Sequence, residues 1–110
     1  MIIDRDGNIT LITQEHPSVK TLVNNIEQSY DKFKSYHLIV NLSSLQKNHL
    51  EDIVEFLRLS NTHRRDQKSF VIVSDKVDLD EMPDEIVVVP TLHEAYDIIE
   101  MEDIERDLGF

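Results

Sequence analysis

Hydroxyl and carboxyl side chains gather at one junction of the chain, in the stretch "NLSSLQKNHLEDIVEF". A short apolar run, 38–41, ends here, Ser43 and Ser44 follow, and Glu51 and Asp52 open the next helical pattern. In folds that alternate strand and helix, such junctions are where ligands and partners usually dock. A serine there can accept a phosphoryl group, and carboxylates beside a helix start place negative charge where the helix dipole favours it. The junction is therefore the candidate position for a catalytic site, a phosphorylation switch or a binding surface.

Signals for catalysis and for bound groups are poor. The two glycines, Gly7 and Gly109, cannot form a glycine-rich phosphate loop, and no GxSxG elbow occurs. The acidic stretch "DKVDLDEMPDE" lacks the central glycine and the terminal glutamate of an EF-hand loop. Five histidines are scattered without metal-binding spacing: His16, His37, His49, His63 and His93. We therefore expect no catalytic site, no metal and no cofactor, and hence a protein that is not an enzyme.

Composition indicates an ordinary globular chain. Its 110 residues suit one core, and we expect a single domain over 1–110. No apolar run approaches the roughly 20 residues of a membrane span, and the first ten residues do not resemble a secretory signal. The absence of cysteine excludes disulfides and thiolate chemistry and fits a reducing compartment. We expect a cytoplasmic protein without membrane insertion.

The net charge of −11 is confined to the last third of the chain. From Asp75 onward thirteen acids face two bases, whereas the first 74 residues hold nine of each. Such a chain repels nucleic-acid phosphates and anionic membranes. The acidic third is either a solvated surface that aids solubility or a face that attracts a basic protein partner.

Hydrophobic periodicity predicts the element order β-β-α-β-α-β-(α)-β-α. Strands are expected in "MIID", "NITLITQ", "HLIVNL", "SFVIVS" and "IVVVP", with a hairpin turn at "RDGN" and a helical turn within the acidic loop. The first helix starts near Pro17 and Ser18, and Thr91 caps the last one with Glu94 as its capping-box partner. Strands separated by helices imply right-handed crossovers. We therefore predict an α/β fold with a mixed, mainly parallel sheet flanked by helices. The first helix carries an apolar stripe at spacings of three and four: Val19, Leu22, Val23, Ile26, Tyr30 and Phe33.

The second helix is predicted from about His49 to Arg65. Its core stripe is expected to consist of Leu50, Ile53, Val54 and Leu57. Phe56 and Leu59 lie off this stripe, so we expect them on the surface, where two neighbouring apolar residues favour an interface.

The last helix changes its apolar side part-way along. At 100° per residue, Leu92, Ala95, Tyr96 and Ile99 share one side. Met101, Ile104 and Leu108 lie almost opposite, in a tail of about 100–110 that ends in the apolar ring of Phe110. We expect this tail to fold back after a break, to dock on a partner or on a second copy as a weak homodimer, or to fray.

The whole chain resembles the STAS domain, the family of sulphate transporters and anti-sigma factor antagonists. "LIVNLSSL" is similar to the strand that ends in Asp-Leu-Ser in the family, here Asn41, Leu42 and Ser43. "VVVPTLHEAYDII" is similar to the family's final strand and helix, with Glu94 and Ala95 near the helix start. The closing "EMEDIERDLGF" resembles a short bacterial group sometimes labelled ribonuclease Z, but the chain lacks that enzyme's HxHxDH metal motif and its length.

The resemblance implies a regulatory, protein-binding function without the family's switch. In antagonist proteins a serine of an Asp-Ser-Ser-Gly motif at the second helix is phosphorylated, and here "HLED" occupies that motif. Glu51 replaces the serine, so it is either a permanent substitute for phosphoserine or simply a good first-turn residue. We expect a protein partner at this junction, with a nucleotide- or small-ligand-responsive domain and an enzyme accessory subunit as alternatives. The candidate partner-binding residues are Ser43, Ser44, Asn48, His49, Glu51, Asp52, Glu55, Phe56 and Leu59.

Overall fold

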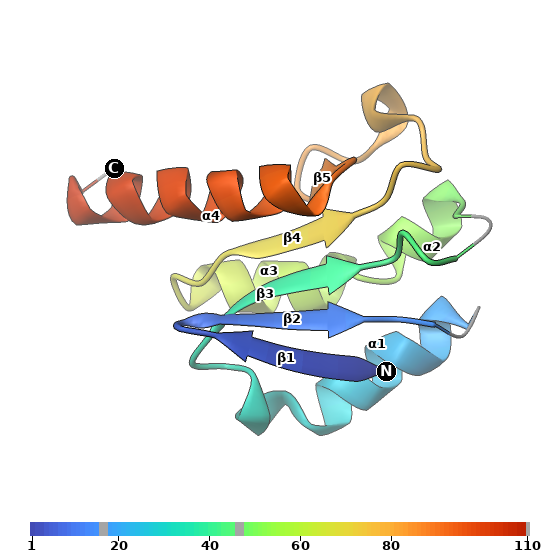
Figure 1. The fold of residues 1–110 in the computed structure, drawn as a ribbon, viewed down its shortest axis with the longest axis horizontal. Helices are drawn as coiled ribbons and strands as arrows, with labels where there is room; N and C mark the ends of the chain where they lie inside the picture. The colour runs from blue at the N-terminus through green and yellow to red at the C-terminus, as the bar shows by residue number, and fades with distance from the viewer. Residues whose placement is uncertain (16–17, 46–47, 110) are drawn as a thin grey trace.

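A computed structural model describes residues 1–15, 18–45 and 48–109. Its five strands form one sheet in the order β1-β2-β3-β4-β5 (Figure 1). β1 and β2 are antiparallel and the other pairs are parallel, which confirms the predicted mixed, mainly parallel α/β fold. The strands are β1 (Ile2–Asp6), β2 (Ile9–Thr13), β3 (His37–Asn41), β4 (Phe70–Val73) and β5 (Val87–Val89). The helices are α1 (Val19–Gln28), α2 (Leu50–Val54), α3 (Leu57–Arg65) and α4 (Leu92–Asp107), with 3₁₀ turns at Tyr30–Lys32 and Leu79–Glu81.

The opening hairpin forms where "RDGN" predicts it. Gly7 has a φ of +58°, a conformation that side-chain-bearing residues rarely adopt. β1 is exposed along its whole length, and the central strands β3 and β4 are almost wholly buried. The unbroken apolar runs of β3 and β4 are therefore explained by helices on both faces of the sheet.

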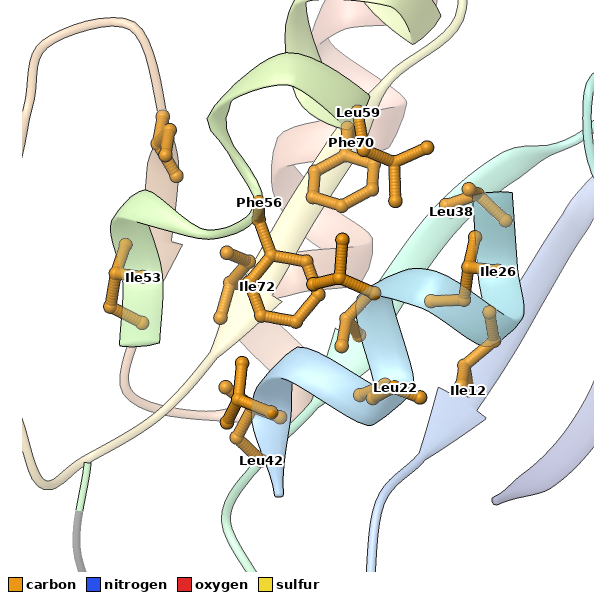
Figure 2. Packing of buried hydrophobic residues seen from close by; sticks show 14 of the residues in the cluster. Ile12, Leu22, Ile26, Leu38, Leu42, Ile53, Phe56, Leu59, Phe70 and Ile72 are labelled. Atoms are coloured by element: carbon orange, nitrogen blue, oxygen red, sulfur yellow. The ribbon is translucent and has the colours of Figure 1, made fainter. Parts of the chain in front are cut away.

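The first face of the sheet is covered by α1, α2 and α3. Ser18 caps α1, its Oγ accepting a hydrogen bond from the Thr21 N–H at 3.3 Å, and Pro17 lies outside the described residues. The buried residues of α1 are those predicted: Val19, Leu22, Val23 and Ile26. Phe33 is buried and Tyr30 partly buried, but α1 ends at Gln28, so these two residues lie beyond the helix that was expected to carry them. Figure 2 shows how side chains from α1, the α2–α3 segment and the strands interdigitate.

Among the described helices, α4 is the one that covers the second face. α4 packs mainly on β4, with smaller contacts to β3 and β5. Ala95 and Ile99 are its buried residues, facing Ile39, Val71 and Val73 on the sheet. Thr91 caps the helix as predicted: its Oγ1 accepts from the Glu94 N–H at 3.2 Å and donates to the Glu94 carboxylate at 3.1 Å.

The predicted second helix is in fact two helices. Between α2 and α3 the Phe56 N–H bonds to the Ile53 carbonyl, three residues back, at 3.0 Å. This tightened turn winds the chain more steeply than an α-helix and rotates the following side chains. As a result Ile53, Phe56 and Leu59 face the core together.

The prediction of which residues of this segment face the core was largely wrong. Phe56 is 0% exposed and Leu59 is 3% exposed, so both are core residues and not surface residues. Leu50 and Val54, expected in the core, are 41% and 44% exposed. The physical reason is that the inward stripe continues through the polar residues 60 and 63, both buried, which a search for apolar periodicity passes over.

Candidate partner-binding site

The site lies where β3 and β4 end and α2 begins. Asn41 closes β3, and its Oδ1 accepts hydrogen bonds from both the N–H and the Oγ of Ser43, at 3.0 and 2.6 Å. This Asx-type turn directs the chain away from the sheet. Ser43 and Ser44 are exposed at its surface, while Leu42 and Leu45 anchor it in the core.

A second loop, which follows β4, is tied to the first. The buried Ser74 hydroxyl donates to the Asn48 side-chain carbonyl and accepts from the Lys76 N–H at 3.3 Å. The Lys76 ammonium donates to the Ser43 carbonyl at 2.8 Å and to the Asp75 carboxylate at 2.7 Å. The hydrogen bond and charge of Lys76 lower the pKa of Asp75. Asn48, predicted to meet a partner, is 5% exposed and joins the two loops instead.

The start of α2 carries negative charge but no hydroxyl group. The Asp52 carboxylate accepts from the His49 backbone N–H at 2.9 Å, which completes one turn around the helix start. Glu51, at the position implied for the switch serine, is exposed, as are His49 and Glu55. Asp52 is half-buried. The surface therefore has negative charge at the helix start and no hydroxyl group to phosphorylate there.

The apolar residues exposed on this surface are Leu50 and Val54, and not the predicted Phe56 and Leu59. Leu50 and Val54 are four residues apart, so they lie one above the other on the outer side of α2. Sequence reasoning missed them because it assigned them to the core. We call the exposed set the α2 surface: Ser43, Ser44, His49, Leu50, Glu51, Val54 and Glu55.

A groove continues the α2 surface toward α1. It has a volume of about 440 Å³, and Val54 and Leu57 line one side while Lys20 and Asn24 of α1 line the other. Across it the Arg58 guanidinium donates to the Glu27 carboxylate at 2.6 Å. The Arg58 side chain is 80% exposed, so this ion pair contributes little to stability. The groove is open, apolar along one wall and charged at its end.

The two histidines that are buried in the described part of the chain, His37 and His63, hold parts of the fold together. The Tyr30 hydroxyl donates to Nδ1 of His63 at 2.6 Å, and Nε2 of His63 donates to the Tyr36 carbonyl at 2.7 Å. Burial lowers the pKa of His63 to about 4, against a smaller opposing effect of the Tyr36 carbonyl. Within the described ranges no three histidine, aspartate or glutamate residues are grouped to hold a metal ion.

His37 belongs to a network that fixes the end of α4. Its Nδ1 accepts from the Ser69 N–H at 2.9 Å, and its Nε2 lies 2.9 Å from the Asp103 carboxylate. Burial lowers the pKa of His37, although Asp103 acts in the opposite direction. Arg106 donates to the Ser69 hydroxyl at 2.8 Å and to the Asp103 carboxylate at 3.1 Å. Arg64 donates to the Glu102 carboxylate at 3.1 Å.

Only part of the prediction for the tail is confirmed. Met101, Ile104 and Leu108 are exposed and do not continue the packing of Ala95 and Ile99, as predicted. The alternative of a break near residue 100 is wrong, because α4 is continuous to Asp107. The polar network described above replaces apolar packing over the last turns. Phe110 lies outside the described residues.

Comparison with solved structures identifies the fold. A serine-to-glutamate variant of RsbS from Moorella thermoacetica superposes with a TM-score of 0.63, covering 96% of this chain and 97% of its own, at 13% identity. A chain of the stressosome, a signal integration and transduction hub, gives a TM-score of 0.59 over 91% of this chain and 96% of its own, also at 13% identity. The chain has the STAS-domain fold. No family model matches it, and no curated protein matches it significantly.

The STAS fold gives the junction a defined position in the molecule. Helix α2 lies beside the ends of β3 and β4, where the resemblance places the antagonists' phosphorylated serine (Figure 1). Among the helices described, none is both long enough and apolar enough to cross a membrane.

Proposed function

We propose that this chain is a cytoplasmic, non-catalytic regulatory module that binds a protein partner through the α2 surface. The observation that carries the proposal is the pair Leu50 and Val54, exposed side by side on α2 next to an open groove. A single exposed aliphatic residue needs no explanation, but two neighbouring ones on the same side of a short helix are typical of an interaction surface. Burial of these two side chains against a partner would remove them from water and contribute to binding.

The rigidity of the surroundings supports the same proposal. The two loops beside α2 are cross-linked by Ser74, Asn48 and Lys76, and Phe56 anchors the end of α2 in the core. A surface that is already ordered loses little conformational entropy on binding. The likeness to RsbS and to a stressosome chain fits a module that works by assembly with other proteins.

We further propose that binding here is not controlled by phosphorylation at the start of α2. Residues 49–54 contain no hydroxyl group, and Glu51 keeps a negative charge where the resemblance places phosphoserine. Ser43 and Ser44 are exposed hydroxyl residues of the loop that follows β3. Ser43 already donates its hydroxyl hydrogen to Asn41, so phosphorylation would cost the turn one of its two hydrogen bonds.

The test is affinity purification from the native cells with tagged wild-type protein and with Leu50→Asp/Val54→Asp. We expect a partner that co-purifies with the wild type and is lost from the double variant, while the melting temperature is unchanged because both side chains are exposed. The matched control is Leu79→Asp, an equally exposed leucine in the acidic loop, 42% exposed, which should retain the partner. Loss of the partner from Leu79→Asp as well, or its retention by the double variant, would contradict the assignment.

The ligand-responsive alternative is tested separately. A thermal-shift panel of nucleotides should leave the melting temperature unchanged, because the groove is lined by mixed charges and has no glycine-rich phosphate cradle. A nucleotide that raises the melting temperature, with the effect lost in Lys20→Ala, would favour a ligand-responsive domain.

A further inference from the structure

The outer side of α4 carries a second apolar surface, remote from the α2 surface. Met101, Ile104 and Leu108 are 57%, 53% and 67% exposed. We call these three residues the α4 strip. α4 covers the opposite face of the sheet from α1, α2 and α3, and its last turns extend past the ends of the strands (Figure 1). A partner on α2 therefore leaves the α4 strip uncovered.

The spacing of the α4 strip is that of a helix-pairing seam. Positions 101, 104 and 108 follow the i, i+3, i+7 rule, which places their side chains in one row along the helix. In heptad terms they are consecutive a, d and a positions, the knobs that insert between residues of a second helix. The shape that fits the α4 strip is therefore the apolar side of another helix.

The charges beside the α4 strip select the partner. In the same heptad frame, Glu100 and Asp107 occupy g positions and Glu105 occupies an e position. All three are exposed and make no ion pair with another described residue. The acids on the inner side of α4, by contrast, form ion pairs. Asp103 contacts His37 and Arg106, and Glu102 contacts Arg64. Over the last two turns of α4, the outer carboxylates of Glu100, Glu105 and Asp107 therefore have no cation beside them among the described residues.

These flanking acids disfavour a second copy of the chain as the occupant. In a pairing of two α4 helices, in either direction, acidic flanks would face acidic flanks. An anionic membrane is disfavoured for the same reason. We propose that the α4 strip binds a basic amphipathic helix of a partner protein, with apolar residues on the strip and lysine or arginine beside Glu100, Glu105 and Asp107.

The end of α4 is held in place for such a contact. Although its last turns have little apolar packing, Arg106 bonds to Ser69, and Asp103 bonds to His37. These contacts fix the helix from its inner side and leave the outer side free. Binding then orders only the incoming helix, which lowers its entropic cost.

The probe is a labelled synthetic helix of three heptads with leucine at a and d and lysine at e and g, whose lysines prevent self-pairing. A second probe carries glutamate at e and g. Fluorescence anisotropy should show the lysine probe binding the wild type, with weaker binding at higher salt, and the glutamate probe not binding. Ile104→Asp should weaken binding of the lysine probe at least tenfold.

The matched control is Leu50→Asp on α2, which also exchanges an exposed aliphatic residue for a charge. It should bind the lysine probe as the wild type does. Ile104→Asp adds negative charge, so attraction by charge alone predicts equal or tighter binding. Equal binding by Ile104→Asp, or equal loss in Leu50→Asp, overturns the proposal. If Ile104→Asp is not folded by circular dichroism, the neutral Ile104→Gln replaces it.

Two further measurements complete the test. The variant Glu100→Lys/Glu105→Lys/Asp107→Lys should transfer binding from the lysine probe to the glutamate probe, and failure to transfer it contradicts the assignment of the flanking charges. Sedimentation should show the wild type as a monomer. A dimer that Ile104→Asp dissociates would make a second copy the occupant and overturn the choice of a basic helix.

Discussion

Protonation of His63 should destabilise the folded chain in a defined pH window. Both ring nitrogens of His63 are occupied in the neutral form, by the Tyr30 hydroxyl and the Tyr36 carbonyl, and the ring also contacts Phe70 edge-on at 6.2 Å between centroids. Its side chain is fully buried. The charged form therefore loses its hydration without gaining a counter-ion in contact.

The size of the effect follows from the pKa. Burial holds the pKa of folded His63 at about 4, against 6.5 for an ordinary histidine. Above pH 6.5 the His63 ring is neutral in both the folded and the unfolded chain, so its contribution to the free energy of unfolding is fully present. As the pH falls toward 4, the unfolded chain binds the proton first, so this stability is lost. At about 1.4 kcal/mol per unit of pKa, the loss is about 3 kcal/mol. The pKa of His37 is lowered as well, so its contribution has the same sign.

The assay is urea unfolding between pH 7.5 and pH 4 for the wild type and His63→Phe. The variant should be less stable at pH 7.5, because Tyr30 and Tyr36 lose their partner, and should show a shallower dependence on pH. His93→Gln, which removes an exposed histidine of α4, is the matched control and should keep the wild-type dependence. Equal pH dependence in His63→Phe and the wild type would refute the reasoning.

Two further predictions concern stability. Phe56→Ala should lower the free energy of unfolding by about 3–5 kcal/mol in urea titrations, because it empties a fully buried site, and a loss below about 1 kcal/mol would mean that Phe56 is not core. Thr91→Ala should cost about 1 kcal/mol by removing the cap of α4, whereas Thr91→Ser should restore most of it; equal losses in both would show that the hydroxyl is not the cap.

The sheet and α1 were predictable because their signals are local and redundant. β3 and β4 each contain an unbroken apolar run bounded by polar residues, and α1 repeats its apolar spacing along its whole length. The helical turn at Leu79–Glu81 was also expected from the acidic loop. Thr91 and Gly7 took their predicted roles because capping and a positive φ depend on a few neighbouring residues.

The candidate site was predictable in position but not in its apolar residues. The stripe through Leu50 and Val54 was chosen from apolar residues alone, whereas the stripe that faces the core continues from Phe56 through the polar residues 60 and 63. His63 completes the true inward stripe, but a histidine is buried only when its nitrogens find partners, here Tyr30 and the Tyr36 carbonyl. Those partners come from residues about thirty positions away, which no local pattern reveals.

The same distinction between local patterns and long-range contacts explains which features of α4 were predictable. The sequence showed that one straight helix cannot bury both of its apolar sets, and the exposure of Met101 and Ile104 confirms it. The sequence alone did not show why the helix nevertheless continues. Asp103 and Arg106 hold its end through His37 and Ser69, again a set of long-range polar contacts.

The most direct test of the proposed function is the affinity of the purified partner for unmodified recombinant protein. Calorimetry should show that the unmodified wild type binds and that Leu50→Asp/Val54→Asp binds at least a hundredfold more weakly at an unchanged melting temperature. Mass spectrometry of the native complex should find Ser43 and Ser44 unmodified. Binding that requires phosphate on either serine, or equal affinity of the double variant, would contradict a switch-free module that uses the α2 surface.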